Sequence, residues 1–188
     1  MFILLGLGNP GEKYAKNRHN AGFMFVEWLQ RQYVGGSDWK YNKYADADIL
    51  KITSDSDIAA HIRLLAKPRT FMNRSGFTAN KILSSEAQPL TSFVVAHDDL
   101  DIKLGEYKIQ RGKGPKVHNG LSSIESSLRF KDFLRIRIGI DNRDPAHRTP
   151  GEPYVLQDFS TEEMNVITDL FPIIFQKLLQ VFEAQEQS

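Results

Sequence analysis

Four short polar segments of the chain carry side chains suited to hydrolytic chemistry. They are Arg18-His19-Asn20, Thr70-Phe71-Met72-Asn73, His97-Asp98-Asp99-Leu100-Asp101 and Val117-His118-Asn119-Gly120. A histidine can act as general base on water, a carboxylate can fix its tautomer, and asparagine carboxamides can donate to an oxyanion or accept from an amide. Each segment also has a structural interpretation, because Asn73 and Asn119 are good helix N-caps and Asp98 is a common turn former. Four such groups at strand ends in one chain favour a shared site.

The glycines near the N-terminus predict a tight turn rather than a dinucleotide site. Residues Gly6 to Gly11 match the G-x-G-x-x-G pattern, but a dinucleotide turn requires a helix that begins within the glycines. Here the segment Glu12 to Asn20 is almost wholly polar, and the next apolar helical pattern begins near Ala21. A turn after the first strand places Asn9 at the carboxyl end of that strand, where open α/β sheets build their sites.

The elements that position these residues alternate between strands and helices. Apolar runs and alternating patterns predict strands over 2–7, 49–53, 59–66, 92–97, 106–111 and 134–140. Helical spacing predicts helices over 21–33, 73–85 and 121–129. The segment 54–57 is expected to form a turn between two of the strands. Ser160 to Glu163 is a capping-box pattern that opens a long C-terminal helix, which Pro172 is expected to kink or divide.

These elements predict one α/β domain over residues 1–188. We expect three layers, with a twisted, mixed and largely parallel central sheet flanked by helices, and a C-terminal helical segment from about residue 160.

Composition excludes several classes of protein. The 188 residues are 41% hydrophobic and 25% charged, which suffices for a core without disulfides or metals. The chain has no cysteine, so thiolate nucleophiles and Cys-ligated zinc are excluded. The apolar run Phe2 to Leu7 is too short for a membrane span or a signal segment. We therefore expect a cytoplasmic protein that does not enter a membrane.

Positive charge is concentrated in one stretch of a chain whose net charge is +1. Residues 103–148 contain eleven Lys or Arg against five Asp or Glu, a surplus of six, whereas 151–188 contain seven Asp or Glu and one Lys. A local basic stretch can be the footprint of a polyanion. It can equally be a solvated face that the acidic tail balances.

Five motifs together resemble the bacterial-type peptidyl-tRNA hydrolase family. They are GLGNPGEKYAKNRHNAG, TFMNRSG, HDDLD, HNGLSSI and RIRIGI, in this order and spacing. The match runs from about residue 2 to about residue 160, and the C-terminal helix matches in character only. The resemblance implies an esterase that cleaves the bond between a peptide's C-terminal carboxyl and the 3′ ribose of tRNA, without a cofactor, a metal or a covalent intermediate. We expect a monomer, because a cleft that takes an acceptor stem gains nothing obvious from pairing.

The resemblance also assigns roles to residues. His19 matches the general base and Asp98 its orienting partner, while Asn9, Asn73 and Asn119 match the carboxamides that position the peptide backbone, the terminal nucleotide and the attacking water. Tyr14 and Met72 match positions of the cleft wall, and His118 matches the histidine beside the third asparagine. Neutral carboxamides would accept an N-blocked peptide and leave a free α-ammonium poorly solvated.

Six basic residues are expected to contact the tRNA. They are Lys108, Arg111, Lys113, Lys116, Arg135 and Arg137. Arg137 is supported by the family motif, and the others by charge alone. The loop before His118 departs from the family, because Pro115 and two lysines stand where small residues are common, which predicts a stiffer and more basic loop. Asn17 stands where a threonine is common, with no obvious chemical cost.

Two other classes of function stay open at this stage. A non-catalytic RNA-binding or ribosome-associated relative would keep the fold, although intact His19, Asp98 and all three asparagines argue against it. A metal-dependent hydrolase could use the oxygen ligands of the run 97–101, which lacks a second metal-ligand motif. His61 and His147 have no partner motif and are interpreted as structural or solvent-exposed.

Overall fold

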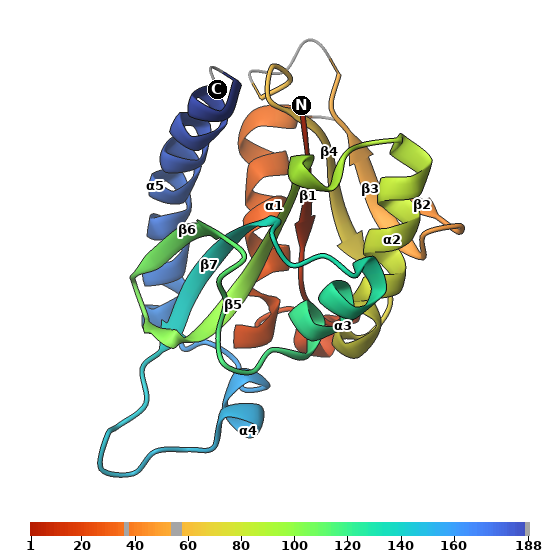
Figure 1. Cartoon of the computed structure of the whole chain (residues 1–188). Coiled ribbons are helices and arrows are strands. Elements are labelled where there is room, and N and C mark those ends of the chain that lie inside the picture. The colour runs from red at the N-terminus through yellow and green to blue at the C-terminus, as the bar shows by residue number, and fades with distance from the viewer. Residues whose placement is uncertain (36–37, 54–57, 187–188) are drawn as a thin grey trace.

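A seven-stranded mixed sheet organises the molecule (Figure 1). The computed structural model describes residues 1–35, 38–53 and 58–186, so the expected turn at 54–57 lies outside the described residues. The strand order is β2-β3-β4-β1-β5-β7-β6. The bounds are β1 Phe2–Gly6, β2 Lys40–Asn42, β3 Ala47–Lys51, β4 Ile62–Pro68, β5 Phe93–Lys103, β6 Tyr107–Arg111 and β7 Leu134–Asp141.

The four central strands are parallel and the edges are antiparallel. β1 pairs in parallel with β4 and β5, and β5 pairs in parallel with β7. β3 runs antiparallel to β4, β2 to β3, and β6 to β7. The expected mixed sheet with a parallel core is therefore confirmed, and the carboxyl ends of β1 and β5 meet at one edge of the sheet.

Helices cover both faces of the sheet and complete three layers (Figure 1). Their bounds are α1 Ala21–Leu29, α2 Ser75–Glu86, α3 Asn119–Leu128, α4 Gly151–Val155 and α5 Thr161–Glu186. Alternate residues of β1 serve the two cores, because Leu4 packs with α1 and α5 while Ile3 and Leu5 pack with α2 and α3.

Two glycines, Gly6 at the end of β1 and Gly22 in the first turn of α1, allow a close approach of α1 to the sheet. A Cβ on Gly22 would overlap the carbonyl oxygen of Ala96, and a Cβ on Gly6 would overlap the main chain of Gly22. Glycine at both positions brings the segment before α1, which holds His19, directly against β1 and β5.

The C-terminal helix begins as expected but is not divided. The side chain of Glu163 accepts from the Ser160 N–H and Ser160 Oγ accepts from the Glu163 N–H, so the capping box is confirmed. Pro172 lies inside α5 on its exposed side, whereas Phe171 and Phe175 are buried against α1. Pro172 therefore does not divide the helix, because the apolar stripe on the opposite side continues past it, and the expected alternative of a kink stays a prediction.

Four elements differ from the expectations. β5 continues to Lys103, because the polar residues 98–99 still pair with β7 instead of forming a turn. The strand β2 and the short helix α4 were not expected at all. The α-helical hydrogen bonding of α1 ends at Leu29, and a π-helical turn follows over Gln30–Val34. Across the residues that the structure describes, no helix combines the length and the apolar character that a membrane span requires.

Candidate active site

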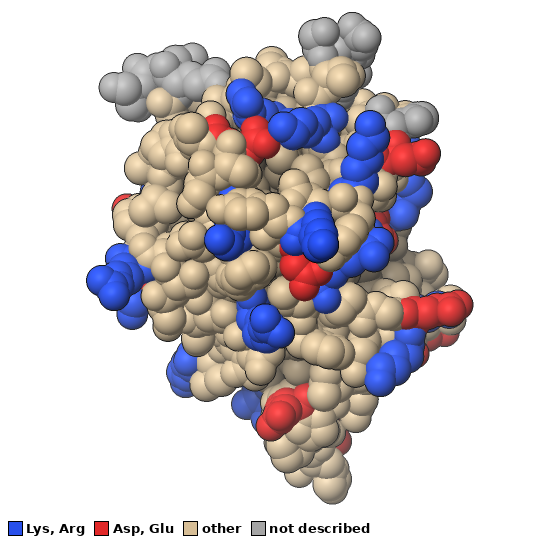
Figure 2. Space-filling model, turned by 90° about the vertical axis from the view of Figure 1, so that its right-hand side faces the viewer, with Lys and Arg blue, Asp and Glu red and all other residues tan. Residues whose placement is uncertain are grey.

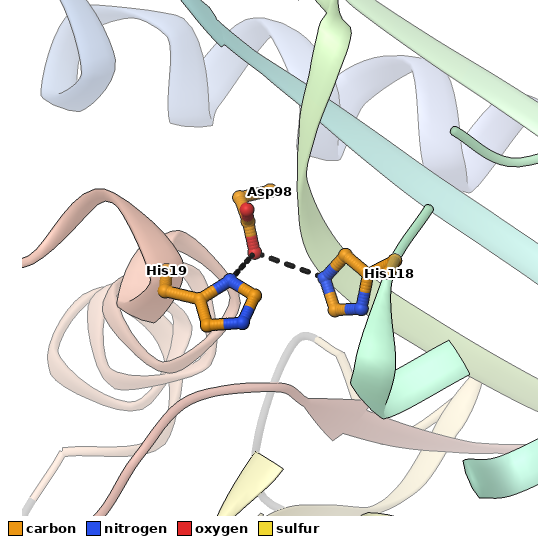
Figure 3. A group of neighbouring side chains, drawn as sticks. All are labelled: His19, Asp98 and His118. Atoms are coloured by element: carbon orange, nitrogen blue, oxygen red, sulfur yellow. Dashed lines mark hydrogen bonds and ion pairs between the residues drawn. The ribbon is translucent and has the colours of Figure 1, made fainter. Parts of the chain in front are cut away.

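Two histidines share one buried carboxylate oxygen (Figure 3). His19 lies in a 3-10 helix, Arg18–Asn20, directly before α1, Asp98 lies on β5, and His118 precedes α3. Asp98 Oδ1 is 2.8 Å from His19 Nδ1 and 3.0 Å from His118 Nε2. Asp98 is only 2% exposed and both histidines are buried. Segments that are far apart in the sequence thus meet at the carboxyl edge of the sheet.

The hydrogen bonds define where the protons lie. His118 Nδ1 accepts from the backbone N–H of Leu121 at 3.3 Å, so His118 carries its proton on Nε2 and donates it to Asp98. An ionised carboxylate only accepts, so His19 donates its Nδ1–H to the same oxygen. The Nε2 of His19 is then left with a lone pair, as a general base requires.

Burial and neighbouring charge shift the pKa values of Asp98 and His19 in opposite directions. Burial alone would raise the pKa of Asp98, but the two histidines hold it well below its usual range through their charge and hydrogen bonds. Burial alone would lower the pKa of His19, but the charge and hydrogen bond of Asp98 outweigh it and raise that pKa above 6.5. Asp98 therefore stays ionised and makes His19 a stronger base.

Asn9 presents one free donor beside this pair. Its main chain is held by Asn20, whose Oδ1 accepts from the Asn9 N–H at 2.9 Å and whose Nδ2 donates to the Asn9 carbonyl at 3.0 Å. Asn9 Oδ1 accepts from the Met72 N–H at 2.9 Å. Its Nδ2 has no acceptor among the described residues. The carboxamide is thus fixed with an N–H available to a ligand.

The other two asparagines are not helix caps. The cap of α3 is His118, and neither α2 nor the 3-10 helix Met72–Arg74 before it has a side-chain cap. Asn73 and Asn119 are exposed, and their side chains make no hydrogen bond within the described part of the chain. The capping interpretation was therefore wrong, and both carboxamides are free to meet a ligand.

A cleft of about 370 Å³ brings all these residues together. Its lining includes the expected residues Asn9, His19, Met72, Asn73, Asp98, His118 and Asn119. The remaining lining residues were missed by sequence reasoning and are Phe71, Leu100, Pro115, Val117, Gly151, Glu152, Val155 and Leu156. Phe71, Leu100 and Val117 lay inside the quoted motifs, and Pro115 lay in the basic loop before His118, but α4 gave no signal. Tyr14 is not in the lining; its ring meets that of Phe71 edge-on, with centroids 6.3 Å apart.

Arg18 anchors the segment that carries His19. Its guanidinium is 2.6 Å from Glu163 Oε2 and donates to the Asp158 carbonyl at 2.8 Å, while its Cζ lies 4.3 Å from the centre of the Tyr154 ring. Tyr154 belongs to α4 and Glu163 to the first turn of α5. His19 is therefore held between the sheet and the α4–α5 corner.

Arg135 and Arg137 do not face solvent, which corrects their expected role at the tRNA. Arg137 Nε is 2.7 Å from Asp99 Oδ2, and its Nη1 donates to Gln110. Arg135 pairs with Glu125 at 2.9 Å and donates to the carbonyl of residue 131. Both guanidinium groups are buried and engaged by the protein, so neither is available to a phosphate.

The lysines of the basic stretch are exposed. Lys108, Lys113 and Lys116 lie on the surface. Arg111 is half-buried and donates to the Thr91 and Asp132 carbonyls and to Gln185. Positive charge is not confined to this stretch, because the face that carries α2 shows many Lys and Arg side chains among fewer Asp and Glu (Figure 2).

One group of residues has the spacing of metal ligands. Within the described chain, His19, Asp98 and His118 offer ligand atoms that lie within 4.8 Å of one another. The run 97–101 does not form the metal site considered from the sequence. Asp99 pairs with Arg137, and Asp101 accepts from a loop N–H. His97 is buried, its Nδ1–H meets the Asp98 carbonyl, and burial together with neighbouring His118 lowers its pKa to about 3.

The two remaining histidines lie away from the cleft. His147 is exposed beside Asp144, as expected, and His61 is half-buried with its ring 6.0 Å from that of Phe182.

A histidine oriented by a buried carboxylate, in a cleft at the carboxyl edge of a parallel sheet, is typical of hydrolases that activate water. Residues 3–188 match the family model described as peptidyl-tRNA hydrolase. The chain therefore belongs to the peptidyl-tRNA hydrolase family, whose members are hydrolases.

Relatives of known name cover most of the chain. The peptidyl-tRNA hydrolase of Mycobacterium avium is 39% identical over 167 residues, which are 88% of this chain and 83% of that protein. That of Nocardia farcinica is 36% identical over 181 residues, 96% and 88% of the two chains. Two crystal structures of peptidyl-tRNA hydrolase from Acinetobacter baumannii, one of them a point variant, are 29% and 28% identical with TM-scores of 0.82 and 0.78. Each match covers 97% of this chain and 93% of the other.

Proposed function

We propose that this protein hydrolyses the ester between the C-terminal carboxyl of a peptide and the 3′ ribose of tRNA, with His19 as general base. The observation that carries the proposal is the hydrogen bond of 2.8 Å between His19 Nδ1 and Asp98, which leaves His19 Nε2 free at a cleft lined by three asparagines. Family membership supports the substrate class.

The reaction needs one proton transfer in each direction. His19 Nε2 takes a proton from water while the water oxygen bonds to the ester carbonyl carbon. The carbonyl oxygen becomes an oxyanion, which the free N–H of Asn9 stabilises. As the tetrahedral intermediate collapses, the bond to the ribose oxygen breaks and that oxygen takes the proton back from His19. The negative charge of Asp98 stabilises the imidazolium in between.

The lining of the cleft supports direct attack by water. Among its described residues there is no serine, threonine, tyrosine, lysine or cysteine, so the usual nucleophiles of covalent catalysis are missing there. Asp98 is committed to two histidines. Glu152 on α4 is the one other carboxylate of the lining.

Specificity follows from the neutral donors. A blocked amino group can share hydrogen bonds with the exposed carboxamides of Asn73 and Asn119, whereas a free α-ammonium would lose its hydration beside neutral groups. We infer sequence-independent tRNA contacts from the exposed Lys108, Lys113 and Lys116, since phosphates carry no base identity. We also propose that the enzyme acts as a monomer in the cytoplasm.

The test compares N-acetyl-aminoacyl-tRNA with free aminoacyl-tRNA, in the presence of EDTA. We expect rapid cleavage of the blocked substrate only, and a loss of that cleavage in His19→Ala. The matched control is His147→Ala, because the His147 side chain is 87% exposed and also pairs with an aspartate. Binding of tRNA without cleavage would overturn the proposal in favour of a non-catalytic RNA-binding protein, and cleavage abolished by EDTA would favour a metal-dependent hydrolase.

A further inference from the structure

The exposed aromatic side chains of the molecule gather beside β2 and α2. In the described part of the chain, the exposed Phe, Tyr and Trp residues are Tyr41, Tyr44, Phe71 and Phe77, and their exposed fractions range from 41% to 56%. The two tyrosines lie on β2 and directly after it, and the two phenylalanines lie before α2 and within it. Because water solvates large rings poorly, a group of them on one face indicates a contact surface.

Cations lie over three of these rings. The Nζ of Lys81 is 4.5 Å from the centre of the Tyr44 ring and 5.7 Å from that of Phe77. It also donates to the Tyr44 hydroxyl at 3.3 Å. The Cζ of Arg69 is 4.7 Å from the centre of the Tyr41 ring. Positive charge and exposed rings therefore alternate on this face.

The positive charge near α2 is only partly neutralised. Lys43, Arg74 and Lys81 form no ion pair with any residue that the structure describes. Lys43 and Arg74 are exposed, and Lys81 is half-buried. Asp46, the acidic residue of the turn after β2, accepts from the Tyr41 hydroxyl at 3.1 Å. Figure 2 shows the excess of Lys and Arg over Asp and Glu on this face.

The turn after β2 is fixed against α2. The buried Thr78 hydroxyl of α2 donates to the Ala45 carbonyl at 2.9 Å, and the Ala45 N–H donates to Asn42 Oδ1 at 3.0 Å. Tyr44 in the turn and Phe77 on the helix therefore keep a constant relation to each other. A partner that binds both rings pays little to order the backbone.

We propose that this basic and aromatic surface beside α2 binds a single strand of RNA. The α2 surface consists of Lys43, Tyr44, Arg74, Phe77 and Lys81. Bases stack on exposed rings and phosphates pair with cations, whereas a duplex hides the faces of its bases. RNA is the nucleic acid we assign, because the family is named for an RNA substrate. None of the five residues lines the catalytic cleft, so this site is separate from that of the ester.

The test measures the fluorescence anisotropy of a labelled oligouridylate of about twelve nucleotides, titrated with the full chain. We expect Tyr44→Ala and Phe77→Ala each to raise Kd about tenfold, because each removes one stacking platform. With three cations, the slope of log K against log salt is expected to be about −2, and about −1.4 in Lys81→Gln. In all three variants, kcat and KM on N-acetyl-aminoacyl-tRNA are expected to stay within about twofold of the wild type, which also reports that they are folded.

The matched controls are Ile173→Ala and Lys177→Gln. Both residues are exposed on α5, which packs against the other face of the sheet, and we expect both variants to bind the probe like the wild type. Absence of binding at about 100 µM wild-type protein, or wild-type affinity in Tyr44→Ala and Phe77→Ala, would overturn the inference.

Three competitors of the probe test the assignment to single-stranded RNA. An RNA duplex that competes as well as the single strand would refute stacking. A polyglutamate of equal charge that competes as well would indicate an acidic polypeptide as the partner. An oligodeoxythymidylate that competes better than the oligouridylate would refute the choice of RNA. Each of these results overturns the inference and leaves the proposed function standing, because the α2 surface lies outside the cleft.

Discussion

Replacing Asp98 by asparagine changes the charge at the centre of the site and little else. Asp98→Asn keeps the shape of the side chain but removes the negative charge on which both imidazoles converge. In the wild type, burial lowers the pKa of His19, and Asp98 more than reverses this effect. Burial remains in the variant, so we expect the pKa of His19 to fall from above 6.5 to below it.

The size of the effect depends on pH. A positioned general base contributes about 10²- to 10⁴-fold to rate, and we expect kcat to fall by about that factor near pH 8. A weaker base is the cause, together with the loss of the charge that stabilises the imidazolium. The difference in kcat between wild type and variant should narrow below about pH 6, because most of His19 is protonated there in the wild type, while a larger fraction of it remains neutral in the variant.

The assay is the initial rate on N-acetyl-aminoacyl-tRNA from about pH 5.5 to pH 9. Asp144→Asn is the matched control, because Asp144 forms an exposed pair with His147 at 3.1 Å. A fall in kcat of less than about threefold near pH 8 would refute the role assigned to Asp98. The same role would be refuted if the acid limb of the pH–rate profile lay at the same pH in the variant as in the wild type.

Three further substitutions probe how the site is supported. Arg18→Met removes the cation beside the half-buried carboxylate of Glu163, and we expect it to lower the free energy of unfolding by about 2 kcal/mol, measured in urea. We expect kcat to fall as well. Arg137→Gln leaves the fully buried carboxylate of Asp99 without its cationic partner. We expect it to lower the free energy of unfolding by about 3–5 kcal/mol and to leave the salt dependence of KM unchanged. A flatter salt dependence would show that Arg137 does meet phosphate. Lys116→Ala is expected to raise KM and to flatten its salt dependence without a change in unfolding, and a constant KM would contradict it.

The apolar patterns predicted the sheet well where strands are buried on both sides. β1, β4 and β7 were expected within a few residues, because continuous or alternating apolar runs have few other solutions. β2 has three residues, mostly polar, and α4 contains a proline within five residues, so neither carries a periodic signal. The polar end of β5 looked like a turn because its side chains serve the site rather than the core.

Arg135 and Arg137 show that the residue pattern of a strand does not predict whether its polar face is covered by the rest of the protein. Ile136 and Ile138 of β7 pack toward α1 and α5, and Arg135 and Arg137 alternate with them. Such alternation is typical of a strand with one solvated face. Here the second face is covered too, and the acceptors of Arg137 come from elements far along the chain, Asp99 on β5 and Gln110 on β6. Pairing between distant elements has no local signature, so charge, and for Arg137 also the family motif, predicted a phosphate contact.

The loop before His118 combines two functions that the sequence suggested separately. Pro115 and Val117 line the catalytic cleft, while Lys113 and Lys116 are exposed. The loop is held in this arrangement by the Lys116 N–H, which donates to Asp101 Oδ2 at 2.8 Å. On the proposed function, a phosphate bound by the lysines lies one residue away from side chains that border the ester. One short segment would then bind the tRNA backbone and place its 3′ end. Lysines at positions 113 and 116 leave the cleft intact because their side chains are exposed, whereas Pro115 and Val117 line the cleft.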